Sequence, residues 1–228
     1  MHSNKDNLQV LHEDNHLVVI NKRAGDIVQG DKTGDKPLSD VVKEYIKDKY
    51  NKPGAVYLGT VHRLDRPTSG VVIYARTSKA LERLNKMLRE KTIKKTYWAV
   101  VKNEPKKSEG TLINFLKKNP KNNKSTAYPK EIDGSKKAIL HYKTLKKLDN
   151  YSLLEIDLET GRHHQIRVQL SNIGATIKGD LKYGAKRSNK DGSIHLHARK
   201  IEFIHPVSKE LIRITAPTPK EAIWDACL

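Results

Sequence analysis

The chain has 228 residues, of which 36% are hydrophobic and 31% charged, and its 44 lysines and arginines against 26 acidic residues give a net charge of +18. This length suits one large domain or two small ones. So basic a balance indicates a polyanionic partner, most often nucleic acid, unless the lysines only keep the surface soluble. The single cysteine, Cys227, excludes an internal disulfide framework and a cysteine-rich zinc site.

No apolar run approaches the ~18 residues of a membrane span, and the first residues lack the apolar core of a signal peptide. We therefore expect a soluble cytoplasmic protein without a membrane partner. Residues 1–10 are polar and are expected to form a loose N-terminal segment.

Apolar runs and periodic stripes predict the elements of the first hundred residues. Pro37 is expected to start one helix, and Ser78 is expected to cap another. The predicted strands are residues 17–20, 71–75 and 96–101, and the predicted helices cover residues 38–46 and 78–88.

Residues 102–147 form a lysine-rich region with thirteen lysines and four acidic residues. Its centre, NPKNNKSTAYPK, has the composition of a loop. Alternation predicts paired strands at 138–145 and 151–158, and a final antiparallel pair at 195–203 and 209–216. Because no regular βα alternation is present, we expect an α+β fold with a mixed, mainly antiparallel sheet and flanking helices. No linker divides the chain, so residues 11–228 are expected to form a single catalytic domain.

Two stretches concentrate side chains that could carry chemistry. HRLDRPTSG (62–70) places Asp65 between two arginines just before a strand, where a carboxylate is either a solvated turn residue or a nucleophile. ETGRHHQIRVQLSNIG (159–174) has helical spacing and ends in Gly174, a typical left-handed C-terminal cap. On that helix His163 and Arg167 would lie half-sheltered on one flank of the apolar stripe. A half-buried arginine requires a carboxylate, either in an ordinary structural ion pair or in a site with Asp65.

HRLDRPTSG resembles the catalytic motif of the RluA-type pseudouridine synthases. Four further segments resemble the same family in the same order, so that the resemblance covers residues 11–219. Two positions depart from the family pattern, Arg23 where proline is usual and Gln169 where histidine is common. The further segments are EDNHLVVINKRAG (13–25), KKTYWAVV (94–101), TGRHHQIRVQL (160–170) with its continuation IGATIKGDLKYG (173–184), and LHARKIEFIHPVSKELIRITAP (196–217).

The resemblance implies a pseudouridine synthase catalytic core that isomerises specific uridines of ribosomal or transfer RNA, with no cofactor and no metal. Asp65 would be the nucleophile, attacking either the uracil ring or the ribose, and Arg167 would pair with it. Tyr97 would stack on the flipped base or handle a proton, and Arg63 would fill the vacated space. Further contacts with RNA or substrate are expected from His62, Arg66, Lys95, Arg162, His163 and Gln165.

This is expected to be a short form without an N-terminal RNA-binding module, which the lysine-rich region would partly replace by contacting phosphates. That region could equally be a solvated surface loop. A monomer is expected, because no coiled coil or long apolar edge stands out.

Other functions were weighed against this one. The main alternative is a catalytically silent RNA-binding or RNA-chaperone protein on the same fold. A hydrolase using Asp65 lacks an evident second carboxylate. A metal site at His195, His197 and His205 lacks a completing carboxylate or cysteine motif, and we expect no metal there.

Overall fold

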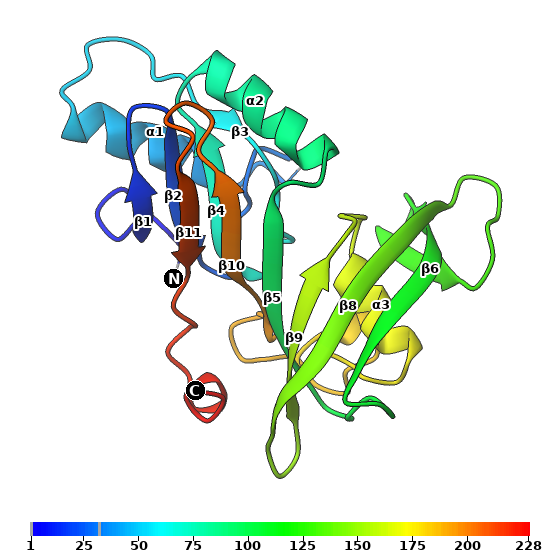
Figure 1. Cartoon of the computed structure of the whole chain (residues 1–228). Coiled ribbons are helices and arrows are strands. Elements are labelled where there is room, and N and C mark those ends of the chain that lie inside the picture. Colours follow the sequence, from blue (N-terminus) through cyan, green and yellow to red (C-terminus); the bar gives the residue numbers. More distant parts are fainter. Residues whose placement is uncertain (1, 32) are drawn as a thin grey trace. The chain divides into compact units, whose positions relative to one another are not determined.

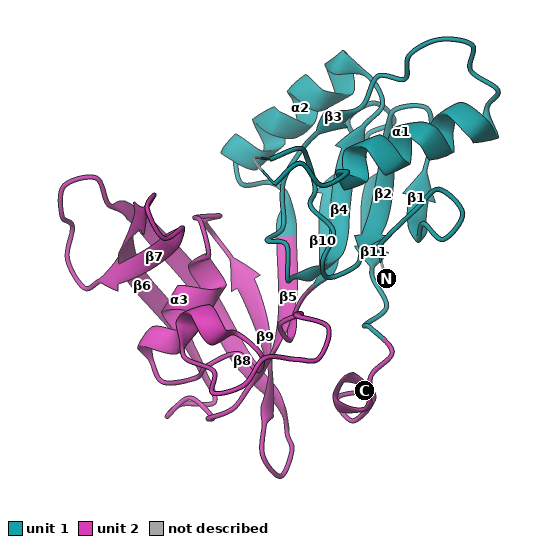
Figure 2. Ribbon diagram, turned by 180° about the vertical axis from the view of Figure 1, so that it is seen from behind, with its two compact units in different colours: residues 1–94, 198–219 teal, residues 95–197, 220–228 magenta. Residues whose placement is uncertain are grey.

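The computed structural model describes residues 2–31 and 33–228 and divides into two compact units. Unit 1 is built from residues 1–94 and 198–219, and unit 2 from residues 95–197 and 220–228 (Figure 2). Each unit is therefore assembled from two separate stretches of chain. The expected single catalytic domain over residues 11–228 stays a prediction.

Unit 1 is a sheet with the strand order β1–β2–β4–β10, in which β3 pairs with β4 and β11 with β10 (Figure 1). The pairs β1–β2, β2–β4, β3–β4 and β10–β11 are antiparallel. The strands are β1 (Val10–Glu13), β2 (Leu17–Lys22), β3 (Gly59–Thr60), β4 (Ser69–Ala75), β10 (Leu196–Ile204, in this unit from Ala198) and β11 (Leu211–Thr215), and the helices are α1 (Leu38–Lys49) and α2 (Ser78–Arg89).

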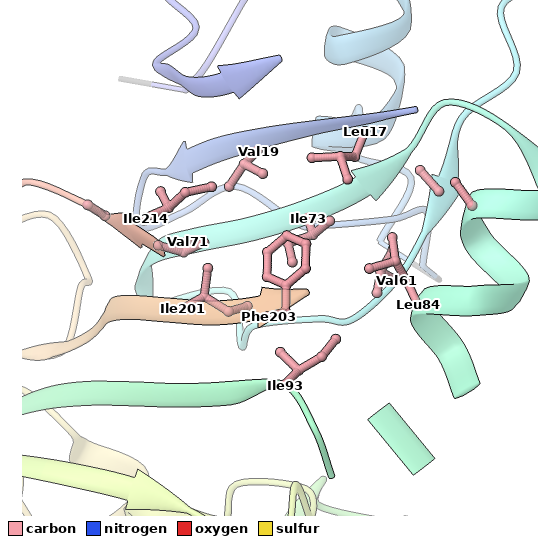
Figure 3. Packing of buried hydrophobic residues seen from close by; sticks show 13 residues of the cluster. Leu17, Val19, Val61, Val71, Ile73, Leu84, Ile93, Ile201, Phe203 and Ile214 are labelled. Carbon is pink, nitrogen blue, oxygen red and sulfur yellow. The ribbon is translucent and has the colours of Figure 1, made fainter. Parts of the chain in front are cut away.

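The two helices of unit 1 pack against different residues of the same strands. Leu17 and Val19 of β2 belong to a core cluster with Leu84 of α2 (Figure 3). Val18 and Ile20, which point the opposite way, pack with the apolar stripe of α1. Because both faces of β2 and β4 are covered, these strands read as continuous apolar runs in the sequence.

Unit 2 is an antiparallel sheet with the strand order β5–β9–β8–β6–β7. Val168 of α3 packs on Leu116 and Ala138 from one face of this sheet. Near the C-terminus, Trp224 packs with Val100 and Leu153. The elements are β5 (Lys94–Val101), β6 (Glu109–Asn119), β7 (Lys124–Tyr128), β8 (Lys136–Lys147), β9 (Ser152–Leu158), α3 (Gln165–Asn172), the 3₁₀ turn η1 (Leu181–Tyr183) and α4 (Ala222–Asp225).

The predicted mainly antiparallel sheet with flanking helices is confirmed, as are the predicted helices at 38–46, 78–88 and around Arg167. Two local predictions are wrong. Thr77 caps α2, since its side chain accepts the amide hydrogen of Ala80, and Ser78 is the first helical residue. The segment NPKNNKSTAYPK contains a strand, β7, which pairs with β6 because their backbone hydrogen bonds outweigh its turn-rich composition.

Candidate active site

The loop that carries Asp65 enters β4 in unit 1. The amide of Thr68 donates to the carbonyl oxygen of Asp65 at 3.0 Å, which closes a turn around Arg66 and Pro67. Leu64 packs against the core cluster that includes α1, so this leucine anchors the loop to the core. The Asp65 side chain is half-buried. Turn and anchor together hold this carboxylate at the mouth of a buried strand.

Lys22, at the end of β2, binds the backbone of the same loop through its side chain. Only 1% of its surface is exposed, and its Nζ donates to the carbonyl oxygens of Arg23 at 2.9 Å and Arg66 at 3.1 Å. Burial lowers the pKa of Lys22 from 10.5 to about 7, against the opposing pull of the Asp26 and Asp65 carboxylates. The Asp65 carboxylate therefore lies near enough to this amine to raise its pKa.

The other charged residues of the loop have different surroundings. Arg63 is exposed. Arg66 is also exposed and pairs with Asp35 at 2.6 Å. His62 is half-buried, and its Nε2 accepts the amide hydrogen of Ile73 at 3.2 Å, which orients the ring against β4. Contacts of these three residues with RNA stay predictions.

Tyr97 and Lys95 lie on β5 in unit 2. Tyr97 is 7% exposed and is in register with Ile156 of β9. Lys95 is half-buried, and its ammonium group would lie 3.6 Å from a Cβ placed on Gly161. Burial lowers the pKa of Lys95. Lys95 thus lies beside the segment that leads into α3.

The segment before α3 is held by Gln165. This side chain is 3% exposed; its Oε1 accepts from the amide of Arg162 and from the hydroxyl of Thr160, and its Nε2 donates to the carbonyl of Ile139. Gln165 therefore stabilises the loop, whereas the guanidinium of Arg162 reaches the backbone of Lys137. The predicted roles of Gln165 and Arg162 in binding RNA are untested.

The histidines at the start of α3 pack on each other. His163 is half-buried, as predicted, but the prediction that it lies on the flank of the helix is wrong, because it precedes α3; its ring stacks on His164 with 3.7 Å between ring centroids. Ser125 Oγ lies 2.9 Å from His163 Nδ1. His164 itself has a left-handed φ of 54° and is 8% exposed. Burial, with the charge of Arg167 next in size, lowers the pKa of His164 to about 2, so this imidazole stays neutral.

Arg167 is more deeply buried than the sequence indicated, with 5% of its surface exposed. It forms a two-point ion pair with Asp180, through Nε to Oδ2 at 2.7 Å and Nη2 to Oδ1 at 2.8 Å. Its guanidinium also lies 5.1 Å from the ring centroid of Tyr183. The structural ion pair considered for Arg167 therefore exists. The further pairing of Arg167 with Asp65 stays a prediction.

The structure thus brings the predicted residues together in two groups. His62, Arg63, Asp65 and Arg66 share one loop of unit 1, and the other group belongs to unit 2. Sequence reasoning missed Lys22, Asp180 and Tyr183. A lysine that directly follows the buried run LVVIN was a readable signal for Lys22, because such a position is seldom charged without a reason.

The three histidines considered for a metal have other neighbours. His195 and His197 lie against Trp224, and His195 Nε2 is 3.1 Å from Glu221. His205 accepts backbone amide hydrogens within its own turn. Across residues 2–31 and 33–228, no three His, Cys, Asp or Glu side chains gather in a way that could hold a metal ion. In the same ranges, every helix is too short or too polar to cross a bilayer.

The family described as RNA pseudouridylate synthase matches residues 16–172, a stretch that includes the Asp65 loop, Tyr97 and Arg167. The chain belongs to this family. An uncharacterised RNA pseudouridine synthase of Synechocystis is 36% identical over 93% of the chain and 66% of that relative. The ribosomal large subunit pseudouridine synthase C of Buchnera aphidicola is 37% identical over 92% of the chain and 67% of that relative.

Among solved structures, the human RNA pseudouridylate synthase domain containing 4 superposes with a TM-score of 0.77 at 25% identity, over 93% of this chain and 89% of that one. The family and the fold implied by the sequence are therefore both confirmed. The chain spans about two thirds of the length of these two curated relatives.

Proposed function

We propose that this pseudouridine synthase isomerises a uridine of ribosomal or transfer RNA, with Asp65 as the nucleophile. The observation that carries the proposal is the HRLDRPTSG loop, which holds a half-buried carboxylate and is bound through the backbone of Arg66 to the amine of Lys22, in a chain of this family. A carboxylate that keeps its charge while losing water is a stronger nucleophile. Relatives named as ribosomal large subunit pseudouridine synthases favour ribosomal RNA as the first target to examine.

The reaction is an isomerisation, so nothing is consumed. The bond between N1 of uracil and C1′ of ribose breaks, the ring rotates, and a bond from C5 to C1′ forms. C5 loses a proton and N1 gains one. Asp65 attacks either C6 of the ring or C1′ and is released unchanged at the end.

The other residues orient the nucleophile, the base and the RNA for these reaction steps. Arg167 pairs with Asp65 and orients it, since an arginine can bind two carboxylates through two edges of its guanidinium. Tyr97 offers one aromatic face, which binds a base without preventing its rotation. Arg63 occupies the place that the flipped nucleotide leaves, and flipping costs a few kcal/mol that stacking and phosphate contacts offset.

Two measurements test the proposal. Pseudouridine mapped across ribosomal and transfer RNA, in cells with and without this gene, identifies the target. The purified protein should then modify that RNA, and Asp65→Asn should abolish the modification, whereas Asp149→Asn, an exposed carboxylate in the β8–β9 turn, should not. Absence of any gene-dependent site would favour an RNA-binding protein without this activity, and full activity of Asp65→Asn would refute Asp65 as the nucleophile.

A further inference from the structure

Two buried side chains, Asp180 and Tyr183, anchor the guanidinium of Arg167. Asp180 is 1% exposed, and its two carboxylate oxygens engage Nε and Nη2 of the arginine at 2.7 and 2.8 Å. A two-point contact of this kind fixes the plane of the guanidinium as well as its position. The ring of Tyr183 contacts the same guanidinium through its π system.

Tyr183 also contacts the turn end of the β6–β7 hairpin. Its hydroxyl accepts the amide hydrogen of Ser125 at 2.8 Å and bonds Nδ1 of His164 at 2.9 Å. Since His164 stays neutral, the tyrosine can donate its own hydrogen to that nitrogen. The ammonium of Lys124 lies 5.3 Å from the centroid of the same tyrosine ring.

Lys182, next to Tyr183 in the sequence, also binds the β6–β7 hairpin. Lys182 Nζ donates to the carbonyl oxygens of Asn122 and Asn123, at 3.4 and 3.2 Å, in the turn of the hairpin. We call residues 117–124 the lysine hairpin, because they carry Lys117, Lys118, Lys121 and Lys124. The segment 180–183 therefore contacts the arginine through Asp180 and Tyr183, and the lysine hairpin through Lys182 and Tyr183.

We propose that Asp180 and Tyr183 are positioning residues that orient Arg167, and that they couple its orientation to RNA bound on the lysine hairpin. This inference rests on the proposed function, in which Arg167 aims the nucleophile. Phosphates that order the hairpin would also fix the amide of Ser125, and through it the hydroxyl of Tyr183. RNA contact on the hairpin then raises the reaction rate in addition to the affinity.

The anchoring of Arg167 by Asp180 and Tyr183 can be tested without measuring enzyme activity. In ¹⁵N-labelled full-length protein, Arg167 should give a slowly exchanging Nε–H resonance, assigned by its loss in Arg167→Lys. That resonance should disappear or exchange rapidly in Asp180→Asn, and should shift in Tyr183→Phe, which keeps the ring and removes the hydroxyl. Unchanged Arg167 resonances in both variants, or in Tyr183→Phe alone if Asp180→Asn does not fold, would refute the anchoring of Arg167 by these two residues.

The coupling is tested by single-turnover kinetics on an RNA stem-loop that contains the uridine mapped above. Tyr183→Phe should lower the rate at saturating RNA about tenfold, while the Kd for RNA stays within about twofold of wild type. Lys124→Gln and Lys121→Gln each remove one cation from the lysine hairpin, but only Lys124 contacts the tyrosine ring. Both should raise the Kd about two- to threefold, and Lys124→Gln should lower the saturated rate more than Lys121→Gln does.

A double variant tests whether Lys124 affects the reaction rate through Tyr183. In the Tyr183→Phe background, adding Lys124→Gln should raise the Kd as before and lower the saturated rate less than it does in wild type. Equal effects of Lys124→Gln and Lys121→Gln on the rate, or a Tyr183→Phe rate equal to wild type, refute the coupling. If wild type itself forms no pseudouridine, the proposed function fails. The resonance experiment still decides whether Asp180 and Tyr183 anchor Arg167.

Discussion

Replacing Gly70, at the end of the Asp65 loop, by alanine should strongly destabilise the protein. Gly70 has a φ of +113°, in a region that residues with a side chain rarely adopt. A Cβ at this position would lie 2.5 Å from the amide nitrogen of Ala198 in β10 and closer still to its carbonyl oxygen. Backbone cannot rotate aside as a flexible side chain can, so β4 and β10 would have to separate.

The magnitude follows from two separate costs. A left-handed backbone costs a residue with a Cβ about 1–2 kcal/mol. Overpacking a closed contact adds about 1–3 kcal/mol. Together these lower the free energy of unfolding by roughly 2–5 kcal/mol, a large part of the ~5–15 kcal/mol typical of a folded protein.

Gly34→Ala is the matched control in the same unit. Its φ is +76°, and no atom lies within 4 Å of the added Cβ, so this variant incurs the backbone cost alone. Urea unfolding followed by circular dichroism measures both free energies. We expect Gly70→Ala to lose at least about 1 kcal/mol more than Gly34→Ala. Equal losses would refute the steric argument, and a stable Gly70→Ala would refute both parts of it.

Three further outcomes are expected. Charge reversal of the four lysines of the lysine hairpin should weaken RNA affinity and flatten its salt dependence, and unchanged affinity at low salt would contradict a role in phosphate binding. Lys22 binds fewer protons in the folded than in the unfolded state between pH 7 and 10.5, so wild-type stability relative to Lys22→Met should rise from pH 7 to pH 9.5 in urea titrations; a constant difference would oppose a depressed pKa. The neutral His164 should make wild type lose stability relative to His164→Gln as the pH falls below 6.5, and parallel acid unfolding curves of the two proteins would argue against this.

The helix around Arg167 could be predicted because its signals are local. Apolar spacing and a final glycine predicted it, and Gly174 indeed has a φ of +81°. The amides of Gly174 and Ala175 donate to the carbonyls of Ser171 and Leu170, the pattern of a Schellman cap. Local chemistry was sufficient at this position because the helix end satisfies its own backbone.

The hairpin of β6 and β7 could not be predicted from the same kinds of signal. Its strands are rich in lysine, and the exposed Ile113 breaks the apolar pattern expected of a buried face. What holds β6 is pairing with β8, which is distant in sequence from the start of β6, and β7 in turn pairs with β6. Asp180 was missed for a similar reason, since nothing near it in the sequence indicates burial, and only the folded chain brings Arg167 to it.

The division of each unit into two stretches of chain bears on how the protein is synthesised. Unit 1 places β10, which is translated after about 120 intervening residues, beside β4. Unit 2 receives Trp224 into a cluster with Val100 and Leu153, which precede it by 124 and 71 residues. Contacts between segments so distant in sequence slow folding, because the loops they close are long. During translation neither unit can complete its core until its second stretch, residues 198–219 for unit 1 and 220–228 for unit 2, has left the ribosome, and we expect removal of residues 220–228 to slow or arrest the maturation of unit 2.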